Sequence, residues 1–149
     1  MFRGISEVTI DAKGRLSLPV RFRAAVLAEN GGVMVATIDT QERCLLLYRL
    51  KEWEAIEQKL SALPSFDASA RRIQRLLIGH ATECEIDAQG RLLLAAPLRE
   101  YAHLERDILL VGQGQKFEVW SATLWQEKRQ QWLSEEIQAL PEEMKHLSL

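Results

Sequence analysis

A repeated segment constrains the fold of this chain more than any other feature of its sequence. Residues 7–18 read EVTIDAKGRLSL and residues 83–94 read ECEIDAQGRLLL, so eight of twelve positions are identical at an offset of 76. The similarity returns downstream, where LLLY (45–48) and FEVW (117–120) are each followed, at the same spacing, by a tryptophan. Two related halves are therefore expected in one chain.

Each half has the pattern strand, strand, short helix, strand, strand. Apolar and polar residues alternate around DAKG and DAQG, which predicts a β-hairpin with Gly14 and Gly90 at positive φ. Pro19 and Pro97 suit the first turn of a short helix. The segments VMVATI (33–38) and CLLLY (44–48) predict a second hairpin, as do ILLVG (108–112) and KFEVW (116–120).

Helices are expected between the halves and after the second half. Apolar residues recur at helical spacing from Trp53 to Leu63, and Pro64 ends that run. Ser65 or Asp67 could cap the next helix, and Gly79 could end it. A last helix is expected from Thr123, where Thr-Leu-Trp-Gln matches a capping box. Its apolar stripe comprises Trp125, Trp132, Ile137 and Leu140, and Pro141 ends it.

A half of about 50 residues is too small to bury a stable core alone, so the two halves should cover each other's apolar faces. The sequence thus predicts an α+β protein with an intramolecular pseudo-dimer and flanking helices. The expected boundaries are a first half at 5–50, a helical linker at 51–80, a second half at 81–122, and a C-terminal helix and tail at 123–149.

Composition places the chain among soluble proteins. It has 149 residues, of which 47% are hydrophobic and 27% charged, and no apolar run approaches the roughly 20 residues that cross a bilayer. The N-terminus lacks the apolar segment of a signal peptide, so a cytoplasmic location is expected. The cysteines, Cys44 and Cys84, lie too far apart for a CxxC motif, and both should be buried.

Charge is distributed unevenly along the chain. The net charge is −2, yet residues 1–23 carry five basic residues against two acidic ones. A basic end on an acidic chain is a candidate nucleic-acid footprint, although such a run of charge is more often only a solvated surface. The candidate DNA-binding residues are Arg3, Lys13, Arg15, Arg21 and Arg23.

The duplicated turns place an aspartate and an arginine across each loop, Asp11 with Arg15 and Asp87 with Arg91. Such a pair can hold the hairpin together, or the arginine can meet a phosphate or a guanine edge. We expect Arg91 to be structural, because Gln89 replaces the lysine of the first loop and acidic residues surround it. If the Asp87 pair is buried, removing Arg91 would strand a charge. For Arg15 both roles stay open.

No catalytic constellation is present in the sequence. The three histidines, His80, His103 and His146, have no motif around them, and neither a GxSxG nor a Walker-type loop occurs. The GQG at 112–114 precedes a strand and is expected to be a hairpin turn. Neither an enzyme nor a bound metal or cofactor is therefore expected.

The segments DAKGRLSLPVRFR and DAQGRLLLAAPLR resemble the paired Asp-x-x-x-Arg motifs of the MraZ family, as do the opening MFRG, CLLLY and RRIQRLLIGHA. The resemblance implies the duplicated swapped-hairpin β-barrel of the AbrB/SpoVT superfamily. It also implies a transcriptional regulator of the division and cell-wall gene cluster that binds promoter repeats in double-stranded DNA. Nucleoid association and a ring-shaped homo-oligomer, with an octamer as one size, are implied as well.

Gln89 and Ala95 depart from the basic pattern of the first copy, so an equal role in DNA binding for both halves is not expected. Two other classes of function remain open. An antitoxin-like module of the same superfamily would wrap a protein partner with its C-terminal segment, and an enzyme would need a pocket with converging titratable groups. A small-molecule substrate and a membrane are not expected partners.

Overall fold

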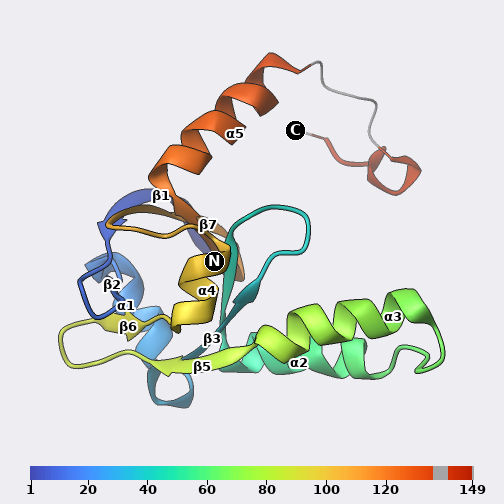
Figure 1. The fold of residues 1–149 in the computed structure, drawn as a ribbon, viewed down its shortest axis with the longest axis horizontal. Helices are drawn as coiled ribbons and strands as arrows, with labels where there is room; N and C mark the ends of the chain where they lie inside the picture. Colours follow the sequence, from blue (N-terminus) through green and yellow to red (C-terminus); the bar gives the residue numbers. More distant parts are fainter. Residues whose placement is uncertain (136–140, 149) are drawn as a thin grey trace.

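The structure is a computed structural model that describes residues 1–135 and 141–148 (Figure 1). The first half contributes the strands β1 (Phe2–Thr9), β2 (Arg15–Ser17), β3 (Val33–Ile38) and β4 (Leu45–Arg49), with α1 (Val20–Leu27) and a 3-10 turn, η1 (Asn30–Gly32), between β2 and β3. The second half contributes β5 (Thr82–Glu85), β6 (Arg91–Leu93), β7 (Asp107–Gly114) and β8 (Lys116–Ser121), with α4 (Ala96–Tyr101) in the same place. The order of elements expected for both halves is confirmed.

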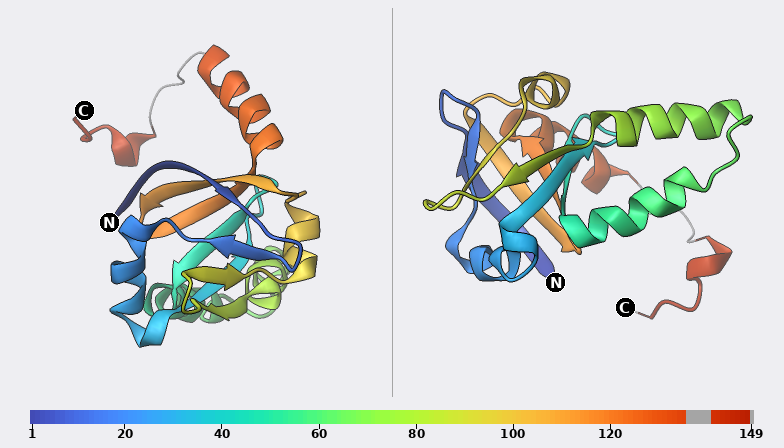
Figure 2. Two further views of the ribbon diagram at one scale, coloured as in Figure 1. Left: turned by 90° about the vertical axis from the view of Figure 1, so that its left-hand side faces the viewer. Right: turned by 90° about the horizontal axis from the view of Figure 1, so that it is seen from below.

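The remaining helices follow the last strand of each half. After β4 come α2 (Leu50–Ser61), α3 (Ala68–Ile73) and the π-helical η2 (Gln74–Ile78), whereas α5 (Ala122–Ser134) follows β8 and η3 (Glu142–Met144) lies near the C-terminus. Figure 2 shows α2 and α3 projecting from the body as an antiparallel pair. Among the described residues, no helix is long and apolar enough to cross a membrane.

Strands of the two halves are interleaved. β1 pairs with β7 and β5 with β3, while β4 and β8 pair at the centre, giving an antiparallel sheet in the order β1-β7-β8-β4-β3-β5. β2 and β6 pair with each other in a separate two-stranded sheet. The first strand of each half therefore lies beside the third strand of the other half, so each half needs the other to complete its sheet.

This pairing corrects one expectation from the sequence. The turns at DAKG and DAQG form, with Gly14 at φ 90° and Gly90 at φ 77°, but the strands on either side of them do not pair as hairpins. In the first half only Ile10 and Leu16 make an isolated bridge. The reason is length, because β1 finds eight register partners on β7, whereas β2 offers only three residues.

The second hairpin of each half forms as expected. β3 pairs with β4, and β7 pairs with β8 around Gly114, whose φ is 81°. The GQG segment itself belongs to the end of β7, where residues 112–114 pair with residues 2–4 of β1, so the chain turns at the end of this segment, around Gln115, and the expected GQG turn is only partly correct. The two hairpins meet where β4 pairs with β8 at the centre of the sheet, so the last strands of the two halves pair with each other.

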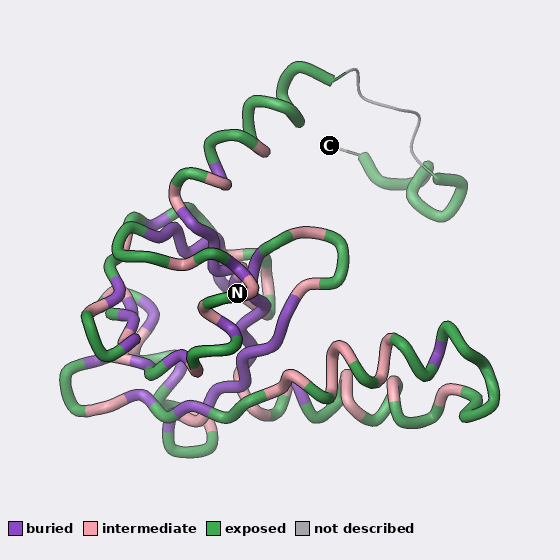
Figure 3. Tube along the Cα trace, viewed as in Figure 1, coloured by how far each residue is buried: buried purple, intermediate pink, exposed green. Residues whose placement is uncertain are grey.

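The main core lies between the six-stranded sheet and the small β2–β6 sheet. Leucines from both small strands and the residues that follow them are fully buried in it, namely Leu16, Leu18, Leu92 and Leu94. Phe22 of α1 and Leu98 of α4 close the sides of this core. Figure 3 shows the buried residues concentrated in this body and the exposed residues on the projecting helices.

Helix boundaries agree with the sequence at some positions and differ at others. Asp67 caps α3 by accepting from the backbone N–H of Ser69 at 2.9 Å, so the second of the two candidate caps is used. Gly79 does not provide a left-handed C-cap, because its φ is −62° and the helical backbone runs on through it. Pro19 is the N-cap of α1, and Pro97 lies in the first turn of α4.

The last helix begins earlier than the capping-box pattern predicts. Ser121 caps α5 by accepting from the N–H of Leu124 at 3.4 Å, so the expected start at Thr123 is wrong. The helix starts as soon as β8 ends at Ser121. Trp125 is buried as expected, whereas Ile137 and Leu140 lie outside the described residues.

Candidate nucleic-acid interface

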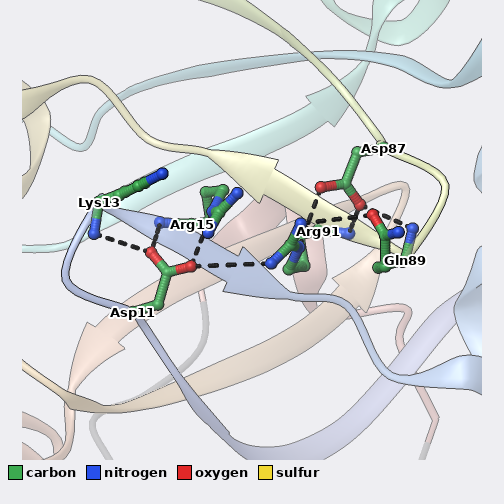
Figure 4. A network of polar contacts seen from close by, with 6 residues as sticks. All are labelled: Asp11, Lys13, Arg15, Asp87, Gln89 and Arg91. Atoms are coloured by element: carbon green, nitrogen blue, oxygen red, sulfur yellow. Dashed lines mark hydrogen bonds and ion pairs between the residues drawn. The ribbon is translucent and has the colours of Figure 1, made fainter.

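The two Asp-x-x-x-Arg loops have the same geometry (Figure 4). One oxygen of Asp11 accepts the backbone N–H groups of Lys13 and Arg15 at 3.0 and 2.9 Å, and its other oxygen accepts Nε of Arg15 at 2.7 Å. Asp87 repeats each of these bonds with Gln89 and Arg91, at 2.9, 2.8 and 2.9 Å. Each carboxylate therefore closes its own turn and orients the arginine that follows.

These hydrogen bonds favour the ionised carboxylates. The backbone N–H of Arg15 is the main cause that lowers the pKa of Asp11 to about 2. The backbone N–H of Arg91 lowers the pKa of Asp87 in the same way. Both aspartates are thus anionic at neutral pH, and each arginine stays beside a fixed negative charge.

The two arginines differ in what their terminal nitrogens touch. Within the described residues, the side chain of Arg15 bonds only through Nε and leaves both Nη atoms without a partner. Arg91 also donates from Nη2 to Oε1 of Gln89 at 3.3 Å, and its Nη1 lies 4.0 Å from the carboxylate of Asp11. Arg15 can therefore accept a further ligand more readily than Arg91. All four side chains are about one-third exposed, so removing Arg91 would not strand a buried charge.

Each loop is also covered by an arginine from the helix of the other half. Arg99 of α4 lies over Gly14, where a Cβ atom would come within 2.7 Å of its guanidinium carbon, and Arg23 of α1 lies over Gly90 in the same way. Arg23 donates from Nε to the carbonyl of Leu18 at 2.9 Å, and Arg99 donates to that of Leu94 at 3.0 Å. The hydrogen bonds hold each arginine within its own half, and the contacts with Gly14 and Gly90 join the two halves at the loops.

Backbone hydrogen bonds connect the loops as well. The N–H of Leu18 donates to the carbonyl of Gly90 at 2.8 Å, and the N–H of Leu94 donates to that of Gly14 at 2.9 Å. Each loop is therefore held by the strand end of the opposite half. The candidate surface is consequently composite, since the first loop lies beside Arg99 and the second beside Arg23.

The basic residues expected to bind DNA do not form a single cluster. Lys13 is exposed at the tip of the first loop, and Arg23 lies at the second loop. Arg21 is exposed on α1, stacks over the ring of Phe22 and donates to the hydroxyl of Ser6. Arg3 is exposed opposite Gln113, six residues or about 20 Å before the end of β1.

Reasoning from the sequence missed Arg99. Its position corresponds to Arg23 at the 76-residue offset of the repeat, and that equivalence was the available signal. What the sequence alone could not indicate is that Arg99 covers the first loop instead of its own. Which half supplies the arginine over a given loop depends on how the strands of the two halves interleave.

Other reactive groups lie away from these loops. Cys44 and Cys84 are buried and free, as expected, and burial raises the pKa of both thiols, that of Cys84 to about 12. The ring of His80 contacts the carbonyl of Leu76 through Nδ1 at 2.7 Å. Both thiols are therefore protonated at neutral pH and poorly suited to act as nucleophiles.

Comparison with known proteins agrees with this duplicated architecture. A family model described as "MraZ protein, putative antitoxin-like" matches the chain twice, over residues 1–76 and 77–147. The chain belongs to the MraZ family. The double match coincides with the two Asp-x-x-x-Arg loops, so each loop belongs to one copy of the MraZ unit.

Curated relatives extend over the whole chain. Proteins named "Transcriptional regulator MraZ" from Legionella pneumophila (strain Corby), Coxiella burnetii (strain RSA 493 / Nine Mile phase I) and Halorhodospira halophila (strain DSM 244 / SL1) are 59%, 53% and 51% identical to it. In each case the alignment covers all of this chain and all of the relative. The similarity to these MraZ proteins therefore includes both halves and the helices that follow them.

Proposed function

We propose that the protein is a DNA-binding regulator of transcription that binds repeats in the promoter of the division and cell-wall gene cluster. The names of its full-length relatives support a role in transcription. The proposed contacts are Lys13, Arg15, Arg3, Arg21 and Arg23, with Arg99 added because it lies over the first loop. The proposal includes no catalytic step, cofactor or metal.

The first loop is better suited than the second to contact DNA, because its arginine has free terminal nitrogens in the described part of the chain. Arg15 is oriented by Asp11 yet keeps both terminal nitrogens free within the described residues, and exposed Lys13 lies two residues away. An arginine held in this way can present two parallel N–H groups to a phosphate or a guanine. In the second loop Gln89 replaces the lysine, and its Oε1 accepts a hydrogen bond from Nη2 of Arg91.

We further propose the swapped-hairpin architecture of the AbrB/SpoVT superfamily for this chain. The exchange of first strands between halves supports it, as β1 pairs with β7 and β5 with β3. The halves would then span 5–50 and 81–122, with 51–80 as a helical linker and 123–149 as a C-terminal helix and tail.

A ring-shaped homo-oligomer, with an octamer as one size, would present the first loop many times. A few basic residues in one chain bind DNA weakly, but linked copies on spaced repeats gain through effective concentration. Repetition of the basic loop would allow the assembly to bind DNA although each chain has a net charge of −2. The corresponding location is the cytoplasm, at the nucleoid.

A gel-shift or footprinting assay tests the central proposal. The probe is the DNA upstream of the gene, at stated salt, with a shuffled sequence of equal length as competitor. We expect protected repeats that the shuffled DNA does not compete for. Equal competition by both DNAs would contradict sequence-specific binding.

Assembly is tested without DNA by light scattering at micromolar concentration. We expect a single species of more than two chains. A monodisperse 17.0 kDa particle would refute the ring and the multivalent argument, but not DNA binding by the loops.

An antitoxin-like role is the second candidate, because the description of the family model contains that term. The exposed second half of α5 offers a surface that a protein partner could cover. Purification from the native host decides between the two, since a stoichiometric second protein would support the antitoxin-like role.

A further inference from the structure

The C-terminal half of α5 carries an apolar surface that nothing covers within the described residues. Trp132 packs edge-to-face on Trp120 and Trp125, with ring centroids 5.8 and 5.9 Å apart, yet 42% of its surface is exposed. The next residue, Leu133, is 68% exposed. Figures 1 and 3 show this part of the helix standing away from the body.

The equivalent helix of the first half is covered. Trp53 of α2 corresponds to Trp125, and its cluster includes Leu60, which occupies the place of Trp132, together with Leu77 and Ile78 of η2. Residues 77–81 correspond to residues 1–5 at the 76-residue offset, but the latter extend as β1 along β7. The site beside α5 that a helix would fill is therefore open among the described residues.

A complementary surface lies on the α2–α3 pair. α3 and η2 together carry three exposed arginines and no acidic residue: Arg71, Arg72 and Arg75. None of the ion pairs in the described residues includes them. Phe66, in the turn that leads into α3, is 91% exposed.

The charge near the end of α5 has the opposite sign. Glu135 is exposed and directly follows the helix, and the last helical positions, residues 130–134, include no basic residue. Leu133 followed by the acidic Glu135 thus complements Phe66 followed by the three arginines, with Asp67, the N-cap of α3, as the one acidic residue between Phe66 and Arg75. Exposed aromatic residues with a charged rim are typical of protein interfaces.

We propose that the end of α5, with Trp132, Leu133 and Glu135, docks against the α3 surface of a second copy of this chain, with Phe66 and the arginines. The inference rests on the proposed assembly and names the surfaces that form it. The two surfaces differ, so the contact is heterologous, and successive copies can close into a ring. Phe66 is the reason to prefer a protein partner over nucleic acid for this basic surface.

Disulfide trapping tests the contact directly on the full-length chain. The double variant Phe66→Cys/Leu133→Cys is oxidised with copper phenanthroline and analysed on a non-reducing gel, and each single variant serves as the matched control. The native cysteines are buried and should not react. We expect a ladder of two and more chains from the double variant and a single chain from each single variant.

Two gel results would overturn the proposal. Absence of a ladder would mean that these residues do not meet, and a dimer from Leu133→Cys alone would mean that α5 meets α5. The DNA-binding proposal would stand in either case, because the gel contains no DNA.

A second variant examines the charges. Arg71→Gln/Arg72→Gln/Arg75→Gln should raise the concentration of half-assembly about tenfold, as expected for loss of a charged patch facing acidic residues. Lys51→Gln/Lys59→Gln, on exposed positions of α2, is the control and should leave assembly unchanged. Unchanged assembly with weakened DNA binding in the arginine variant would instead assign the surface to nucleic acid and overturn the inference.

Discussion

At the scale of single residues, an aspartate in each loop fixes the orientation of the arginine that follows it. Asp11 uses one oxygen for two backbone N–H groups and the other for Nε of Arg15, so the guanidinium has a fixed orientation. Such preorganisation reduces the entropy lost on binding. The same bonds in the second loop, with Gln89 added, satisfy Arg91 inside the protein.

Substitutions should separate the roles of the two loops. Arg15→Ala and Lys13→Ala should each weaken promoter binding about tenfold, because a base or phosphate contact is lost, while the fold persists. Arg91→Ala should lower the thermal midpoint and leave the affinity of the folded protein near that of the wild type. Promoter affinity and thermal midpoint are measured for all three. If Arg91→Ala instead lowers promoter affinity at an unchanged thermal midpoint while Arg15→Ala lowers the thermal midpoint, Arg91 is the DNA contact and Arg15 the structural residue.

The acidity of Asp11 should make stability depend on pH. Its pKa in the folded protein, about 2, lies below the ordinary value of 3.8, so the ionised carboxylate stabilises the fold above that value. This contribution is lost as the pH falls from about 4 toward about 2. Urea unfolding of the wild type and of Asp11→Asn from pH 6 to pH 2 measures it. The stability gap between them should shrink with acid, and a constant gap would refute the role of the charge.

At the scale of elements, two three-residue strands join the halves. β2 and β6 pair with each other in a separate two-stranded sheet, and the residue after each strand, Leu18 or Leu94, donates to the carbonyl of the glycine in the opposite loop. The arginines of α1 and α4 then cover those glycines. A substitution in one loop should therefore displace the arginine that covers it from the helix of the other half.

Gly14→Ala should be more destabilising than Gly31→Ala. Both glycines have positive φ, which costs an L-residue about 1–2 kcal/mol, but only at Gly14 would the new Cβ displace the guanidinium of Arg99, which would lose its hydrogen bond to Leu94 at an added cost of about 1 kcal/mol. Chemical denaturation gives both values. Arg99→Ala should then cost less in the Gly14→Ala background than in the wild type, and equal effects of the two glycine variants would show that the contact with Arg99 is unimportant.

At the scale of the whole molecule, an acidic chain presents a locally basic loop region. The first loop carries Lys13 and Arg15, and the interleaving of the strands adds Arg99 from the other half. The proposed interface is therefore electrostatic and limited in area for each chain. Its strength would come from repetition in an assembly.

Binding should weaken steeply with salt. Each phosphate contact in duplex DNA contributes about −0.9 to the slope of log K against log salt, so Lys13→Ala should make the slope shallower by about that amount. Titrations between about 50 and 200 mM salt measure both slopes. A wild-type slope near zero would mean that the basic N-terminal residues are only a solvated surface.

The sequence by itself determined the duplication, the order of strands and helices, the positive φ of Gly14 and Gly90, and the Asp–Arg pairs. Each of these depends on a few neighbouring residues, so local patterns are enough to predict them. Only the tertiary structure decided that β1 pairs with β7 instead of β2, that Arg99 covers Gly14, and that Trp132 remains exposed. Those outcomes depend on competition between distant segments for the same strand edge or helix face, which a local pattern does not encode.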